Sequence, residues 1–381
     1  MSEPQAAPTA DRSWLLEAFK GLGCLLIVVH HLAFYGPMAD VVAQAWPRLM
    51  AWLDAHGRLA VQVFLVCGGY LTANSLAKLG TLSPLQCCRL GLKRYLRLAL
   101  PLLAALSLTV LVTELLRPIF NHDSLSPPPD LGQALAHVFL LQHVLGMDGL
   151  SAGVWYVAVD VQLFMSAVLL TWLAQQVQTR WPALSQRQWL EWWWYVLVAA
   201  SWWWWNRHPG LEDWNLYFLG AYGLGWLAHA SRQGHHRTLH MGALLLLCAV
   251  AWHLEPRWQV VTACSVAICL AAAPQSCLSG QALTVGPLRS MMGWLSQISY
   301  SVFVVHFAVS LVVNALVSHW WSADLTANAM GMMASVGLSI LAGATLYAQV
   351  ERPMATGRRW VFWAACFMAS AVLAMQLKQM L

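Results

Sequence analysis

Residues 14–36 form the first long apolar segment, and it contains side chains suited to acid–base chemistry. Lys20 and His31 are eleven residues apart, about three helical turns, which places them on nearly one helix face, ~16 Å apart. Glu17 precedes Lys20 at the i,i+3 spacing of an ion pair. An imidazole in an apolar segment can accept a proton near neutrality, so His31 is a candidate base; the alternative is a neutral histidine satisfied by a backbone carbonyl. His30 points ~100° away and is interpreted as structural.

A carboxylate, Asp160, stands inside another apolar segment, residues 153–174. A charge taken out of water needs a partner cation or a proton, because its desolvation is costly. Lys20, Arg94 and His31 are the candidate partners.

Basic residues cluster where a third apolar segment begins, at Lys93, Arg94 and Arg97. Such a cluster can bind phosphate groups or anchor anionic lipid, and the pattern leaves both open.

Other polar or small residues interrupt the remaining apolar segments. Gly68 and Gly69 permit close helix packing or bring the backbone near a ligand, and packing is the commoner reason. Tyr300 and His306 lie within one apolar run. Glu351 ends another and is interpreted as part of a structural ion pair.

The elements that position these residues are transmembrane helices. The chain has 381 residues, 59% of them hydrophobic and only 10% charged, too few charges to coat a soluble globule. Apolar runs of about 20 residues recur, and they lack the alternation of barrel strands. We therefore predict an all-α, polytopic integral membrane protein of about ten to eleven transmembrane helices, near residues 14–36, 60–78, 97–116, 153–174, 190–205, 214–231, 239–254, 258–274, 295–317, 328–350 and 359–377.

Charge distribution predicts the orientation of these helices. With the N-terminus in the cytoplasm, all but six of the 21 lysines and arginines fall on the cytoplasmic side; the six are Arg48, Arg58, Arg117, Arg207, Arg257 and Lys378. Residues 1–12 are expected to be a disordered cytoplasmic tail and residues 13–381 a single membrane domain. No cleavable signal peptide is expected, because the first apolar run is too long and carries charges.

Two other classes are disfavoured by the pattern. The net charge of +5 is spread between apolar spans, which argues against nucleic-acid binding. The nine cysteines match no metal-ligand or disulfide spacing, so we interpret them as small buried hydrophobes and expect no metal site.

Taken in order, these segments resemble the type-3 membrane acyltransferase family. Its first helix carries an acidic residue, then Arg, then ten residues and a His, and Glu17, Lys20 and His31 stand in those places. Further similar segments are Phe64 to Tyr70, with Gly68 where the family has Ser, Lys93 to Pro101, Trp155 to Phe164, Ser299 to Ser301 with His306, and Glu351 to Pro353.

The resemblance implies a bacterial inner-membrane enzyme that transfers an acyl group, most often acetyl, from cytoplasmic acyl-coenzyme A to a hydroxyl of a carbohydrate or glycolipid. No permanently bound cofactor is implied. It implies a catalytic group of His31, Lys20 and Asp160, in which His31 is the base or the transient acyl carrier. Donor and substrate binding would involve Glu17, Lys93, Arg94, Arg97, Trp155, Tyr300 and His306.

A different class stays open on these residues. The same helices and buried charges would suit a transporter or flippase of a glycan or lipid-linked sugar, although the inverted repeats of many transporters are not visible. Consumption of acyl-coenzyme A discriminates between the two.

Overall fold

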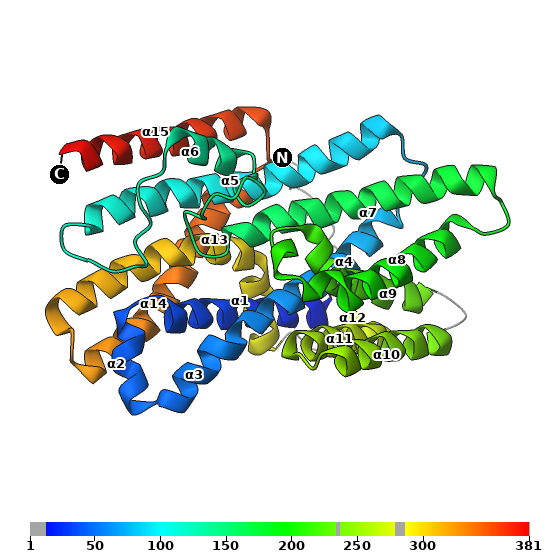
Figure 1. Cartoon of the computed structure of the whole chain (residues 1–381), viewed down its shortest axis with the longest axis horizontal. Coiled ribbons are helices and arrows are strands. Elements are labelled where there is room, and N and C mark those ends of the chain that lie inside the picture. Colours follow the sequence, from blue (N-terminus) through cyan, green and yellow to red (C-terminus); the bar gives the residue numbers. More distant parts are fainter. Residues whose placement is uncertain (1–12, 234–236, 279–285, 381) are drawn as a thin grey trace, which may run out of the picture.

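The computed structural model describes residues 13–233, 237–278 and 286–380, and in these ranges the secondary structure is helical throughout. The predicted tail, residues 1–12, lies outside the described residues. The long helices run side by side as one bundle (Figure 1). They are α1 (Trp14–Phe34), α4 (Ala60–Leu76), α5 (Pro84–Leu116), α7 (Val154–Arg180), α8 (Gln186–Trp203), α9 (Asn215–Gln233), α10 (Arg237–Leu254), α11 (Trp258–Ala272), α13 (Pro287–Trp321), α14 (Leu325–Leu346) and α15 (Gly357–Met380).

Shorter helices lie between them. Two of them, α2 and α3, form a bent hairpin at one end of the bundle (Figure 1). They are α2 (Pro37–Ala45), α3 (Pro47–His56), α6 (Leu131–Val138) and α12 (Gln275–Leu278), with the 3-10 turns η1 (Gly57–Leu59), η2 (Trp205–Arg207) and η3 (Pro209–Leu211) and the π-helical turn η4 (Tyr347–Glu351).

A helix occupies each of the eleven predicted spans, so the chain is a multi-pass membrane protein. Within the described residues, eight helical segments are long and apolar enough to cross a membrane. The three that fall short are α8, α9 and α11. Helix α9 tolerates Gly, Ser and His because it packs against α4, α8 and α11, and every residue from 218 to 231 is buried.

Two helices begin well before the predicted residue. Helix α5 starts at Pro84, not near residue 97, because Ser83 and Gln86 form a reciprocal capping box and Pro84 occupies the first turn. Helix α13 starts at Pro287, not near residue 295. The extension of α5 matters for function, because it carries Arg94 into the bundle as part of a regular helix.

Gly69 and Gly225 allow α4 and α9 to touch through their backbones. A Cβ atom on Gly69 would collide with the carbonyl oxygen of Tyr222, and one on Gly225 with that of Val66. Gly69 therefore has the packing role that is commoner for a glycine in a membrane helix.

The expectation that no cysteine pairs was wrong. Cys248 and Cys264 form a disulfide between α10 and α11. The two helices are neighbours joined by a short turn, which brings residues 16 positions apart to the same level of the hairpin. Sequence spacing alone did not reveal this.

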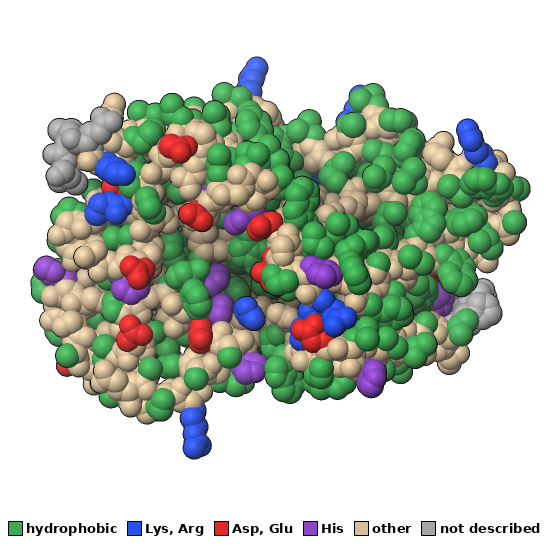
Figure 2. All heavy atoms as spheres, in the orientation of Figure 1, with side chains coloured by type: hydrophobic (Ala, Val, Ile, Leu, Met, Phe, Trp, Pro, Cys, Tyr) green, Lys and Arg blue, Asp and Glu red, His purple; other side chains and the backbone are tan. Residues whose placement is uncertain are grey.

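Acidic side chains mark one end of the molecule. Figure 2 shows most of those visible on this face in its left half, where Figure 1 places α2, α3, α6 and α14, whereas the right half is mainly hydrophobic. The predicted cytoplasmic loops, such as the α4–α5 turn, lie at the opposite end.

Candidate active site

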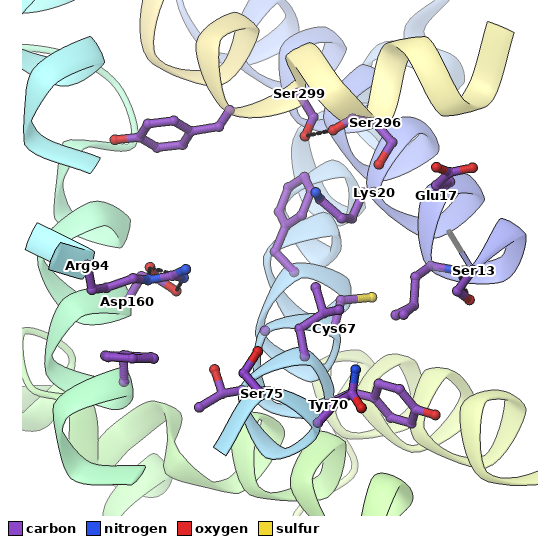
Figure 3. Close-up of a pocket in the computed structure, with 18 of the residues that line it drawn as sticks. Ser13, Glu17, Lys20, Cys67, Tyr70, Ser75, Arg94, Asp160, Ser296 and Ser299 are labelled. Atoms are coloured by element: carbon purple, nitrogen blue, oxygen red, sulfur yellow. Dashed lines mark hydrogen bonds and ion pairs between the residues drawn. The ribbon is translucent and has the colours of Figure 1, made fainter. Parts of the chain in front are cut away.

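A cavity of about 1240 Å³ opens into the bundle. Side chains from α1, α4, α5, α7, α9, α13 and η4 line it. Ser75, Lys78, Gln233 and Gln275 lie at the ends of their helices or in turns, so they mark the mouth at the end that the charge distribution predicts to be cytoplasmic. Figure 3 shows Lys20 reaching from α1 toward the centre of this cavity, with Arg94 and Asp160 on the opposite wall.

The partner of Asp160 is Arg94, one of the three cations the sequence left open. The guanidinium donates from Nη2 to Oδ2 at 2.6 Å and to Oδ1 at 2.8 Å, and from Nε to Oδ2 at 3.1 Å. Its carbon also lies 5.5 Å from the ring centroid of Phe164. Helix α5 thus places a planar cation where a buried carboxylate and an aromatic face fix its orientation.

Lys20 does not pair with Glu17 as the i,i+3 spacing suggested. Within the described residues its ammonium makes no hydrogen bond or ion pair, and it faces the cavity. The Glu17 carboxylate instead lies against α13, where a Cβ atom on Gly293 would stand 3.2 Å from Oε2. Lys20 is therefore available to an anionic ligand.

Glu351 also lines the cavity and was not among the predicted site residues. It ends the π-helical turn η4, which directly follows α14, and such turns occur frequently at functional sites. Ser301 donates to Glu351 Oε2 at 2.6 Å, and Tyr300 on the same helix donates to the Leu98 carbonyl at 2.6 Å. The position of Glu351 at the end of an apolar run was the signal that could have identified it.

The cavity is cationic overall. Five of its lining residues are cations, Lys20, Lys78, Arg94, Arg97 and Arg232, and three are acids, Glu17, Asp160 and Glu351. Arg232 is held by the carbonyls at the end of α11, with the shortest contact 2.6 Å to Ala273. An excess of positive charge in a low-dielectric cleft favours a polyanionic ligand.

His31 and His306 form a pair deeper in the bundle. His31 Nδ1 lies 2.7 Å from His306 Nε2, and the rings stack with centroids 4.9 Å apart. His306 Nδ1 lies 2.7 Å from the Phe303 carbonyl, which only accepts, so Nδ1 carries the hydrogen and Nε2 accepts. His31 then donates from Nδ1, which leaves the lone pair on its Nε2. The pair therefore presents one basic nitrogen, His31 Nε2.

Of the predicted site residues, Glu17, Lys20, Arg94, Arg97, Asp160 and Tyr300 come together around the cavity. Two others lie elsewhere. Lys93 is exposed and does not line this cavity; on α5 it points about 100° away from Arg94. Trp155 stacks on Phe218 at a centroid distance of 5.3 Å and does not line the described cavity.

Although Lys20 and His31 share a helix face, they do not line one continuous cavity wall. Lys20 lines the cavity, but of the described side chains neither His31 nor His306 does. The ring of Phe64 lies across α1 between them, against Gly23, where a Cβ atom would stand 3.2 Å from the ring. Phe64, Tyr156 and Phe303 at the inner end of the cavity were missed by sequence reasoning, since aromatic residues in membrane spans carry no distinguishing signal.

This geometry defines a class of protein, a multi-pass helical membrane protein with a cationic cavity beside a histidine pair. A family model described as an acyltransferase domain matches residues 14–349. Since this covers most of the chain, the protein belongs to the type-3 membrane acyltransferase family and is an acyltransferase. Neither the curated proteins nor the solved structures gave a match.

Proposed function

We propose that this acyltransferase moves an acyl group, most often acetyl, from acyl-coenzyme A to a hydroxyl of a cell-surface or periplasmic carbohydrate. The observation that carries the proposal is the cationic cavity, which opens at one end of the bundle and ends beside the His31–His306 pair. Its five cations suit the phosphates of the donor, and its volume of about 1240 Å³ leaves room for a long flexible arm.

The reaction that fits this arrangement is direct transfer. The acceptor hydroxyl gives its proton to His31 Nε2, and its oxygen attacks the thioester carbonyl. The carbon–sulfur bond breaks, and the coenzyme A thiolate takes the proton from the imidazolium, so an ester and a free thiol leave. His306 Nε2 accepts the hydrogen bond from His31 Nδ1 throughout, which orients the base.

The proposed location is the bacterial inner membrane, with the N-terminus and the cavity mouth in the cytoplasm. Support comes from the basic residues at that end, Lys78, Arg89 and Arg232 among them. The donor would then enter from the cytoplasm, and the acceptor would approach His31 from the opposite side.

Release of free thiol tests the donor. Purified protein given acetyl-coenzyme A and an acceptor glycan is expected to release coenzyme A thiol. Arg97→Ala should raise KM about tenfold or more, because a hydrogen bond to a charged group contributes about 1.5–3 kcal/mol. Lys93→Ala is the matched control, since Lys93 lies one turn nearer the start of α5, does not line the cavity and should leave KM unchanged.

Two results would contradict the proposal. Equal effects of the Arg97 and Lys93 variants on KM would mean that the cavity does not bind the donor. Movement of the glycan across a membrane without thiol release would favour the transporter alternative.

A further inference from the structure

Three aromatic rings close the inner end of the cavity. Phe64 from α4, Tyr156 from α7 and Phe303 from α13 all line it. The ring centroids of Phe64 and Tyr156 are 6.1 Å apart, and those of Tyr156 and Phe303 are 5.6 Å apart. The next ring along α13 is His306, 6.1 Å from Phe303. The three rings therefore stand between the charged part of the cavity and the histidine pair.

Two glycines provide the space in which the outer rings lie. Gly23 on α1 faces the tip of Phe64, where a Cβ atom would be 3.2 Å away. Gly153, just before α7, has a φ of +77°, and a Cβ atom there would lie 2.5 Å from Phe303 Cζ. Larger residues at these two positions would displace the rings of Phe64 and Phe303. The backbone is thus shaped to hold an aromatic layer across the bundle from α1 to α13.

We propose that Phe64, Tyr156 and Phe303 form an acyl filter, a partition that only the uncharged acyl end of the donor passes. The proposal rests on the proposed function and deepens it by naming the substrate class, short uncharged acyl groups. A carboxylate, as in a succinyl group, would lose most of its hydration between the three rings, whose side chains together carry one polar group, the Tyr156 hydroxyl. The nucleotide phosphates stay with the cations on the cavity side.

Phe303 is the ring whose displacement connects the two compartments. Its ring packs against Tyr156 on the cavity side and against His306 on the side of the histidine pair. Its backbone is fixed, because the Phe303 carbonyl accepts the hydrogen bond from His306 Nδ1 at 2.7 Å. Passage of the acyl group therefore requires rotation of the Phe303 side chain while the histidine pair stays in place. The size of that ring sets the size of acyl group that passes.

Two variants and one control test the filter. Phe303→Ala and the milder Phe303→Leu shorten the ring that divides the compartments. Phe367→Ala is the control, because Phe367 on α15 is fully buried but packs near His137, away from the cavity. Both alanine variants lose a comparable buried ring, so they share the cost of a core cavity.

The first measurement is the ratio of kcat/KM for butyryl-coenzyme A to that for acetyl-coenzyme A. We expect this ratio to rise about tenfold or more in Phe303→Ala, to rise less in Phe303→Leu and to stay at the wild-type value in Phe367→Ala. A methylene group accommodated or rejected by an apolar pocket changes specificity by about 10- to 200-fold.

The second measurement does not depend on acyl transfer. Diethyl pyrocarbonate is added to the purified protein, and carbethoxylation of His306, whose side chain is fully buried, is followed by mass spectrometry of peptides. Modification should be slow in the wild type and in Phe367→Ala and at least severalfold faster in both Phe303 variants. Equal rates in all four proteins would overturn the partition.

The outcomes separate the filter from the function on which it rests. Turnover of acyl-coenzyme A with an unchanged chain-length ratio in both Phe303 variants would overturn the filter alone. Absence of any turnover by the wild type would overturn the proposed function and, with it, the filter.

Discussion

Replacement of His31 by Ala is expected to lower kcat for acyl transfer by at least 100-fold while the protein stays folded. A positioned general base contributes about 10²- to 10⁴-fold to a rate, and His31 Nε2 is the basic nitrogen that the histidine pair leaves available. The measurement is thiol release at saturating donor and acceptor, with the folded fraction followed by size-exclusion chromatography in detergent.

His30→Asn is the matched control for this loss. The His30 ring touches its neighbour, but its Nδ1 is occupied by the Leu53 carbonyl at 3.0 Å, in agreement with its interpretation as a structural histidine. This variant should retain kcat within a fewfold. His306→Gln should lose less than His31→Ala, because His306 acts through His31. Near wild-type turnover in folded His31→Ala protein would remove His31 from the chemistry.

The second large effect concerns the Arg94–Asp160 pair. Asp160→Ala should destabilise the protein by about 3–5 kcal/mol, because it leaves a guanidinium in the bundle without its bidentate partner. The same reasoning applies to Arg94→Ala. Thermal unfolding in detergent at constant protein concentration measures the loss.

A double variant, Arg94→Met with Asp160→Leu, distinguishes an unpaired charge from a loss of packing. Apolar residues of similar volume need no partner, so the double variant should recover much of the stability lost by either single variant. It should nevertheless bind donor poorly, because the cavity loses one of its cations. If the single and double variants unfolded at the same temperature, the ion pair would not be what stabilises this wall.

The fold was largely predictable because its signal is carried by long apolar runs. Each predicted span contains a helix, since a backbone in hydrocarbon must satisfy its hydrogen bonds internally. The start of α5 was not predictable in the same way. Its first turns, from Pro84 onward, are polar enough to read as a loop, and a local cap keeps them helical.

The sequence predicted many of the residues of the candidate site, but not which of them contact one another. The spacing of Lys20 and His31 predicted that they share a helix face. It did not predict that Phe64, from another helix, lies between them. Three cations were possible partners for Asp160, and only the packing of α5 against α7 selects Arg94. Contacts between helices distant in sequence depend on register and rotation, which one-dimensional patterns do not specify.

Transfer across a sealed membrane tests whether donor and acceptor reach His31 from opposite sides of the membrane. Protein is reconstituted in one orientation, with radiolabelled acetyl-coenzyme A on the side of the cavity mouth and an acceptor glycan enclosed on the other. We expect labelled ester on the glycan with the wild type, at least 100-fold slower labelling with His31→Ala, and free thiol only on the donor side. Unlabelled glycan alongside an intact pool of acetyl-coenzyme A would contradict this expectation.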